Sequence, residues 1–391
     1  MTTIQSWNKF IAPTYAPPEI KIVSGKGTRV YDELGKSYLD FISGIAVTSL
    51  GHANEEIAEA IYKQAKSLGH VSNMYANPVT EELADRLLEI SGMRNGRVFF
   101  TNSGAEANEA AIKYVRAFKP KSKLLALEGS FHGRTMGALS LTGQTEKRRP
   151  FEPLIPKVEF LKANSVSSAK RKLKNGVGGI WLELIQGEGG VNPLSEKFLS
   201  EVIERANKKS IALVVDEVQT GMGRTGYWFA FQELNLEPNL VPIAKGLGGG
   251  MPIGALLISE EFANLIKPGG HGTTYGGNPI AARSALTVIK LIEENSILDN
   301  VMNQSLFIRN TLSTIPGVNC VRGKGLLLGI VFNREISKRV ASLAMELGLL
   351  VNAVRPDVVR LAPPLNISTS EAEEGIEILT KSIVQAQNES N

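Results

Sequence analysis

Cysteine and histidine are scarce in this chain of 391 residues. The single cysteine, Cys320, cannot form an intramolecular disulfide or a thiolate metal cluster, which fits a reducing compartment. We expect Cys320 to be a small apolar residue of the core. The four histidines show no spacing typical of metal ligands, so the sequence predicts no metal site.

Long apolar runs and an excess of one charge are also missing. No uninterrupted apolar segment approaches the length that spans a membrane, and the beginning of the chain lacks the basic and apolar regions of a secretory signal. The 43 basic and 39 acidic residues leave a net charge of +4, which does not indicate a nucleic-acid-binding surface. We therefore expect a soluble, cytoplasmic protein that binds neither membranes nor nucleic acids.

Short apolar runs alternate with helical patterns over the middle of the chain. This alternation predicts an α/β fold, in which a mostly parallel sheet is covered on both faces and binds ligands beyond the carboxyl ends of its strands. The predicted strands are Arg97–Phe100, Lys123–Leu127, Gly179–Leu184, Ile211–Val215, Leu240–Ile243 and Ala255–Ile258. The predicted helices are Glu55–Leu68, Glu106–Phe118, Glu196–Lys208 and Ala281–Glu293.

The two ends of the chain have a different pattern. Residues 1–20 contain three prolines and are predicted to form an extended arm. The last helix is predicted to begin at Ser370, which has capping-box spacing with Glu373. Further strand candidates are Ile20–Val23, Arg29–Tyr31, Tyr38–Phe41, Leu326–Phe332 and Val358–Leu361. We expect a large domain of residues 50–285 and a smaller α+β domain of residues 1–49 and 286–391, with the site in the cleft between them.

Lys245 and Asp216 carry the most specific chemistry. Asp216 follows the apolar run Ile211–Val215, and Lys245 follows the next run, Leu240–Ile243, just before a glycine cluster. An amine and a carboxylate at the ends of successive strands suit a pyridine aldehyde cofactor, because the amine forms a Schiff base and the carboxylate keeps the ring nitrogen protonated. Taken alone, each residue also has an ordinary alternative, a solvated loop lysine and a structural aspartate.

Other segments offer groups that can bind such a cofactor or its substrate. Residues 101–108 combine small side chains with a predicted helix start, whose free amides suit a phosphate. In the loop of residues 130–135, Phe131 can stack on a planar ring and Arg134 can hold a carboxylate. Residues 271–279 are rich in glycine and offer two threonine hydroxyls. An ordinary capped helix, a core phenylalanine and a connecting loop are the structural alternatives.

Gly221–Gly226 matches the dinucleotide pattern G-x-G-x-x-G, which raises a nicotinamide-dependent oxidoreductase as an alternative. The segment neither follows its strand directly nor opens a periodic helix. Asp216 precedes the glycines, whereas an acid that binds ribose should follow them by about twenty residues. We therefore interpret the pattern as unrelated to nucleotide binding, and the sequence contains no P-loop.

Taken together, these segments resemble the class III, or ornithine-type, aminotransferases. The resemblance runs over nearly the whole chain and rests on the motifs SGAEAN, FHGRT, DEVQTGMGRTG, IAKGLGGG and HGTTYGGNP, which occur in the expected order. It implies the fold type I architecture, in which the large domain is built on a mostly parallel seven-stranded sheet. It also implies pyridoxal 5′-phosphate as the cofactor and a homodimer with shared active sites.

The resemblance implies roles for individual residues. Lys245 attaches the cofactor, Asp216 pairs with its ring nitrogen, and Arg360 binds the α-carboxylate of 2-oxoglutarate. Glu188 pairs with Arg360 when the other substrate is present. The further cofactor-binding residues are Ser103, Gly104 and Ala105 at the phosphate, Thr274 from the neighbouring subunit, Phe131 and Val218 on the two ring faces, Gln219 near the ring oxygen, and Glu217. The further substrate-binding residues are Arg134 and Thr273.

Within the class, three segments favour an enzyme of arginine biosynthesis that transfers the terminal amine of N2-acetylornithine to 2-oxoglutarate. They are Ser43–His52, Glu183–Gly190 and Val359–Leu365. Ornithine-specific relatives usually carry a tyrosine in the first segment, and this chain has none there. Asn54 and Leu184 depart from the common pattern. The alternatives are class III enzymes acting on ornithine, succinyldiaminopimelate, 4-aminobutyrate or a carrier-linked amino acid, and a catalytically silent binding protein.

Overall fold

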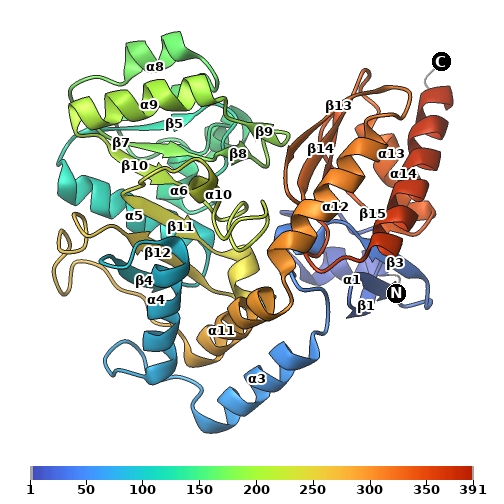
Figure 1. Cartoon of the computed structure of the whole chain (residues 1–391), viewed down its shortest axis with the longest axis horizontal. Helices are drawn as coiled ribbons and strands as arrows, with labels where there is room; N and C mark the ends of the chain where they lie inside the picture. The colour runs from blue at the N-terminus through green and yellow to red at the C-terminus, as the bar shows by residue number, and fades with distance from the viewer. Residues whose placement is uncertain (1–2, 390–391) are drawn as a thin grey trace.

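A computed structural model describes residues 3–389 (Figure 1). Its centre is a seven-stranded sheet in the order β4-β12-β11-β10-β7-β5-β6. Only β12 runs against its two neighbours; the remaining strand pairs of this sheet are parallel. The strands are β4 (Arg97–Thr101), β5 (Lys123–Leu127), β6 (Val158–Leu161), β7 (Val177–Leu182), β10 (Ala212–Val215), β11 (Leu240–Ile243) and β12 (Gly254–Ile258). The predicted α/β class with a mostly parallel sheet is confirmed.

Helices cover both faces of this sheet because its central strands are buried on both sides. One face packs against α5 (Gly104–Phe118), which contributes Ala110, Ala111 and Val115 to a shared apolar cluster. The opposite face packs against a larger cluster that includes α9 (Glu196–Lys209). The remaining helices around the sheet are α3 (Glu55–Ser67), α4 (Pro78–Ser91), α6 (Met136–Leu141), α7 (Thr145–Arg148), α8 (Val166–Lys172), α10 (Ala230–Glu233) and α11 (Pro279–Glu294).

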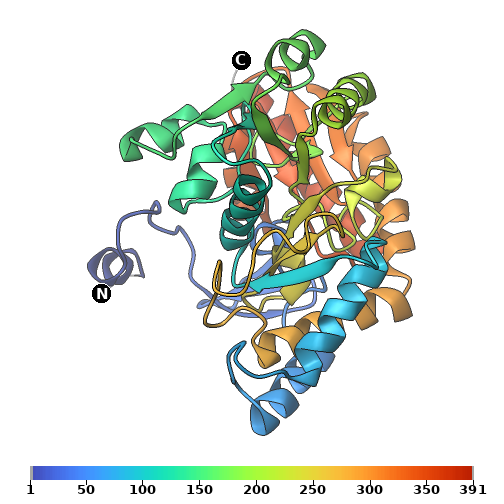
Figure 2. The ribbon, with the colours of Figure 1, turned by 90° about the vertical axis from the view of Figure 1, so that its left-hand side faces the viewer.

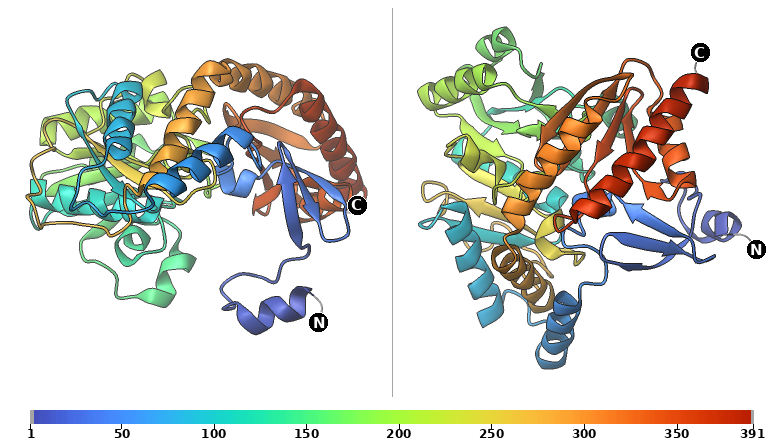
Figure 3. Two further views of the ribbon diagram at one scale, coloured as in Figure 1. Left: turned by 90° about the horizontal axis from the view of Figure 1, so that it is seen from below. Right: turned by 45° about the vertical axis from the view of Figure 1, so that its right-hand side comes forward.

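The two ends of the chain come together beside the large sheet (Figures 1 and 3). One small sheet has the order β1-β2-β3-β15 and joins the N-terminal strands to a C-terminal one; a second has the antiparallel order β13-β14-β17-β16. Their strands are β1 (Ile22–Lys26), β2 (Arg29–Asp32), β3 (Ser37–Asp40), β13 (Val318–Lys324), β14 (Leu327–Phe332), β15 (Leu349–Leu350), β16 (Asn352–Arg355) and β17 (Val358–Leu361). The helices α12 (Ile297–Leu312), α13 (Ser337–Glu346) and α14 (Thr369–Glu389) accompany them. The domain limits at residues 50 and 285 stay a prediction.

Three local predictions are wrong. Residues 3–10 form the helix α1 (Thr3–Phe10) instead of an extended arm, since the prolines begin only at Pro13; this helix projects away from the body of the molecule (Figures 2 and 3). Cys320 is exposed because β13 is an edge strand of its sheet. The capping box of α14 lies two residues earlier than predicted, where Ser368 Oγ accepts from the Glu371 amide at 3.3 Å and Glu371 accepts from the Ser368 amide at 2.8 Å.

A buried arginine joins the large sheet's loops to the C-terminal segments. Arg224 lies in the Gly221–Gly226 segment, which forms turns and opens no helix. Its guanidinium donates from Nη1 to the carbonyls of Leu326, at 3.0 Å, and Pro363, at 2.5 Å. Burial lowers the pKa of Arg224 to about 9. This segment therefore has a structural task in holding two parts of the chain together.

No helix among residues 3–389 has the length and apolar composition needed to cross a membrane.

Candidate active site

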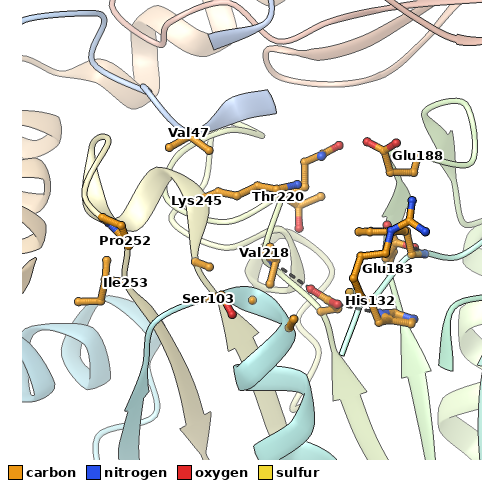
Figure 4. A pocket seen from close by; sticks show the side chains of 18 of the residues that line it. Val47, Ser103, His132, Glu183, Glu188, Val218, Thr220, Lys245, Pro252 and Ile253 are labelled. Carbon is orange, nitrogen blue, oxygen red and sulfur yellow. Dashed lines mark hydrogen bonds and ion pairs between the residues drawn. The ribbon is translucent and has the colours of Figure 1, made fainter. Parts of the chain in front are cut away.

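A pocket of about 460 Å³ lies at the carboxyl ends of β7 and β10 and at the beginning of α5 (Figure 4). This is where a sheet of mostly parallel strands binds its ligands. Its lining contains most of the predicted site residues. Those residues are Ser103, Gly104, Ala105, Phe131, Arg134, Glu188, Asp216, Val218, Gln219 and Lys245. The pocket is also lined by Val47, His132 and Glu183, which the sequence did not single out as site residues.

Lys245 extends its side chain into this pocket (Figure 4). It begins a short 3₁₀ turn directly after β11, and its φ of 46° lies in the left-handed region that non-glycine residues seldom adopt. Such strain typically costs about 1–3 kcal/mol and persists where the surroundings fix it, often at functional sites. Burial and the positive charge of Arg360 lower the pKa of Lys245 to about 8, so a neutral, nucleophilic amine is accessible near neutral pH.

Asp216 is buried at the end of β10 and has a complete set of partners. Its Oδ2 accepts from the Asn108 side-chain amide at 2.9 Å and lies 2.7 Å from His132 Nδ1, while Oδ1 accepts from the Val218 amide at 3.0 Å. Trp181 continues the network by donating to Asn108 Oδ1 at 3.1 Å. Burial disfavours the charged imidazole, but Asp216 and Glu183 outweigh it and raise the pKa of His132. The network fixes the aspartate carboxylate at the pocket wall.

The beginning of α5 offers hydrogen-bond donors to the same pocket. Ser103 caps the helix by accepting from the Glu106 amide at 3.2 Å. Within residues 3–389, the amides of Gly104 and Ala105 have no protein acceptor. An added Cβ at Gly104 would lie 2.7 Å from both γ carbons of Val218, so the absence of a side chain lets Val218 sit against the helix start. Free amides at the start of a 15-residue helix suit a phosphate.

Glu183 holds the aromatic wall of the pocket. Its Oε2 accepts from the Phe131 amide at 2.8 Å, and its Oε1 accepts from the Gly187 amide at 3.4 Å. Burial raises the pKa of Glu183 to about 7, although the neighbouring His132 opposes this. Arg134 lies over the Phe131 ring, with its guanidinium carbon 5.5 Å from the ring centroid. Glu183 thus links the loop that carries Phe131 to the loop that carries Glu188.

Glu188 and Arg360 form an ion pair at the edge of the pocket. Arg360 donates from Nη1 to Glu188 Oε1 at 2.6 Å and to Gln219 Oε1 at 3.1 Å, and from Nη2 to Asn352 Oδ1 at 3.0 Å. Burial favours a neutral Glu188, but the Arg360 guanidinium outweighs it and holds the pKa below its ordinary value. Arg360 is only 3% exposed, so its charge is available to a carboxylate only if Glu188 moves aside.

Four predicted residues lie outside the pocket lining: Arg360, which reaches it through its contact with Glu188, and three residues of two other loops. Glu217 is buried and turned away, with its carboxylate accepting from the Phe231 amide at 2.9 Å and from the Thr220 hydroxyl. Thr273 accepts from the Asn102 side-chain amide at 3.2 Å, close to the helix start. Thr274 is exposed. The roles assigned to these residues stay predictions, and the position of Glu217 favours a structural role.

The residues present fit the cofactor that the sequence resemblance implies. A planar ring has an aromatic wall in Phe131, an apolar one in Val218 and a buried carboxylate in Asp216 for its nitrogen. The free amides of α5 are available to a phosphate, and Lys245 supplies an amine inside the same pocket. His132 and Asn108 escaped the sequence analysis because neither type nor spacing separates them from ordinary core residues.

Comparison with known proteins gives a consistent set of relatives. The family model described as aminotransferase class-III matches residues 10–383. The acetylornithine aminotransferase of Aquifex aeolicus is 45% identical over 95% of this chain and 98% of its own length. That of Corynebacterium efficiens is 42% identical over 96% of each chain. Among solved structures, the ornithine aminotransferase of Toxoplasma gondii matches with a TM-score of 0.93 and 29% identity, covering 98% of this chain and 95% of its own.

Proposed function

Because the chain belongs to the class III aminotransferases, we propose that it is a pyridoxal 5′-phosphate enzyme of arginine biosynthesis that transfers the terminal amine of N2-acetylornithine to 2-oxoglutarate. The products are N-acetylglutamate 5-semialdehyde and glutamate. The observation that carries this proposal is the pocket itself, in which Lys245, Asp216 and Glu188 lie together, with Arg360 paired to Glu188 at its edge. The acetylated donor is supported by relatives that carry this name and are 42% and 45% identical to the chain.

The wall of the pocket near Val47 also supports the acetylated donor. Val47 belongs to the Ser43–His52 segment, in which ornithine-specific relatives usually carry a tyrosine. An aliphatic side chain offers no hydrogen bond to a free α-amino group. It is compatible with a donor whose α-nitrogen carries an apolar acyl group.

Each part of the cofactor has a residue that would hold it. Pyridoxal 5′-phosphate supplies an aldehyde that exchanges amines and a protonated ring that withdraws electrons from the reacting carbon. Lys245 would hold the aldehyde carbon and then, as a free amine, move a proton at its Nζ from the donor carbon. Asp216, fixed by Asn108 and His132, would keep the ring nitrogen protonated. Gly104 and Ala105 would bind the phosphate.

The Glu188–Arg360 pair would let one pocket receive two different substrates. The donor reacts at an amine far from its carboxylate, whereas 2-oxoglutarate reacts beside one. With Glu188 in place, the charge of Arg360 is neutralised, as the 2.6 Å contact shows. When Glu188 turns away, Arg360 can hold the α-carboxylate of 2-oxoglutarate in two-pronged fashion. The two half-reactions then alternate, which predicts ping-pong kinetics.

We further propose that the enzyme acts in the cytoplasm as a homodimer with shared sites. Two exposed tyrosines on neighbouring segments support the dimer: Tyr275, which follows Thr274, is 61% exposed, and Tyr75 is 67% exposed. Their segments meet where the Asn73 side chain donates to the Gly276 carbonyl at 2.9 Å, and contiguous exposed apolar surface is typical of sites that another chain covers.

A half-reaction assay tests the proposed donor. The purified holoenzyme is mixed with N2-acetylornithine or with ornithine, without 2-oxoglutarate, and the change in cofactor absorbance is followed. We expect N2-acetylornithine to react with the higher kcat/KM, and Lys245→Ala to abolish the reaction with both donors. A preference for ornithine, succinyldiaminopimelate or 4-aminobutyrate would replace the proposed donor, and turnover by Lys245→Ala would refute the role of that lysine.

A further inference from the structure

Lys147 is a cation close to the pocket. Neither the sequence analysis nor the proposed mechanism assigns a role to this residue. It lies on the short helix α7, and its ammonium nitrogen is 5.0 Å from the centroid of the Phe131 ring. The guanidinium carbon of Arg134 is 5.5 Å from the same centroid. Phe131 and Arg134 line the pocket; Lys147 does not line it, but its ammonium group lies against the Phe131 ring that forms one wall.

Neither cation has an acidic partner. Within residues 3–389, Lys147 and Arg134 form no ion pair and no hydrogen bond to a carboxylate. Glu188 attracts Lys147 electrostatically, but its Oε1 already accepts from Arg360 at 2.6 Å. Burial lowers the pKa of Lys147; Glu188 and Glu146 oppose this, whereas Arg134 and Arg355 lower the pKa further. A half-buried ammonium beside a second cation gains most from an anion that touches both.

The resemblance already assigns Arg134 to the substrate; we propose that Lys147 joins it in holding the α-carboxylate of the amino donor and thereby selects donors that carry a carboxylate. This inference rests on the proposed function, because it assigns the far end of the donor whose terminal amine reacts at Lys245. The contacts of the three cations indicate which of them binds the donor and which binds the acceptor. Arg360 is covered by Glu188 and serves the acceptor, while Lys147 and Arg134 carry the charge that is uncompensated when the donor arrives.

Steady-state kinetics of the holoenzyme with two donors tests the proposal. N2-Acetylornithine carries the carboxylate, and N-acetyl-1,4-diaminobutane has the same chain without it. We expect Lys147→Met, which removes the ammonium group but keeps an unbranched apolar side chain, to raise KM for N2-acetylornithine about three- to tenfold with little change in kcat. The kinetics with N-acetyl-1,4-diaminobutane should not change. Lys147→Arg should restore most of the affinity.

Lys174→Met is the matched control, because Lys174 is exposed after α8 and, unlike Lys147, has no contact with the Phe131 ring of the pocket wall. It should leave both donors unaffected. The proposal is overturned if Lys147→Met leaves KM for N2-acetylornithine unchanged, changes both donors equally, or raises KM for 2-oxoglutarate alone. If the wild-type enzyme prefers ornithine, the proposed donor is wrong, but the same comparison of ornithine with 1,4-diaminobutane still decides the role of Lys147.

Discussion

At the scale of single residues, two neighbouring acids in one motif have opposite orientations. Asp216 faces the pocket and is held by Asn108 and His132, whereas Glu217 faces Phe231 and Thr220. Burial raises the pKa of Glu217 to about 7, and its hydrogen bonds only partly oppose this. Between about pH 4.5 and pH 7, Glu217 is therefore mostly protonated in the folded protein, whereas it is mostly ionised in the unfolded chain.

This difference predicts how Glu217→Gln changes stability. Since the pKa in the fold lies above the ordinary 4.5, the stabilising contribution of Glu217 is complete below pH 4.5 and is lost as the pH rises through about 7. Glu217→Gln avoids that loss and should increase the free energy of unfolding by roughly 1–3 kcal/mol at pH 8, with the gain shrinking toward pH 5. Urea unfolding at both pH values measures it, with the exposed Glu237→Gln as control.

The same variant tests whether Glu217 contacts the cofactor. The hydrogen bonds to Phe231 and Thr220 predict an unchanged affinity for pyridoxal 5′-phosphate. A tenfold weaker affinity of Glu217→Gln would show that the sequence resemblance placed this residue correctly and that the observed orientation is not the one that binds the cofactor.

The sequence predicted that Lys245 and Asp216 share one site, and both line the pocket, but it did not indicate which residues support them. Lys245 and Asp216 could be predicted because each follows an apolar strand, and the ends of such strands meet at one edge of a sheet. The supporting residues His132 and Glu183 reach the site from separate loops. Their contacts depend on how β5, β7 and β10 are ordered in the sheet, which local pattern does not specify.

At the scale of elements, the start of α5 depends on a close approach of the loop after β10. Gly104→Ala would place a Cβ 2.7 Å from both γ carbons of Val218. We expect Val218 to shift, the affinity for pyridoxal 5′-phosphate to fall about tenfold, and stability to fall by about 1–3 kcal/mol. Titration of the cofactor-free protein, followed by absorbance, measures the affinity.

Gly69→Ala is the control for this substitution, since a Cβ added there meets only the end of the Ile280 side chain, at 4.0 Å. Adding Val218→Ala to Gly104→Ala removes the clash and should recover part of the lost affinity. If Gly104→Ala binds pyridoxal 5′-phosphate with unaltered affinity, the close contact between Val218 and the start of α5 is not needed for cofactor binding.

Elements with a strong local pattern were predicted closely, and those set by long-range contacts were not. The helices α3 and α9 and the strands β5, β11 and β17 have the predicted residues to within one or two positions. The strands β6 and β13 were missed because each has a single buried residue and therefore shows a weak apolar pattern. The helix α1 was missed because the prolines that follow it dominated the interpretation.

At the scale of the whole molecule, shared sites predict complementation between inactive subunits. If each site takes Lys245 from one protomer and Thr274 from the other, a mixed dimer of Lys245→Ala and Thr274→Val subunits contains one fully native site. Refolding the two variants together should then give up to half the wild-type activity per mixed dimer, whereas Lys245→Ala alone stays inactive and Thr274→Val alone binds the cofactor weakly. Absence of any recovery in dimers isolated by size would argue against sharing.

Arg224 bears on how the enzyme exchanges its substrates. Its guanidinium hydrogen-bonds to the carbonyls of Leu326 and Pro363, which flank the strands β14 and β17, and β17 carries Arg360. A wide hinge motion would break these contacts in a dry interior once per catalytic cycle. We therefore expect the two parts of the chain to keep their relative position during catalysis, so that in the proposed mechanism only the torsion angles of the Glu188 side chain change between donor and acceptor.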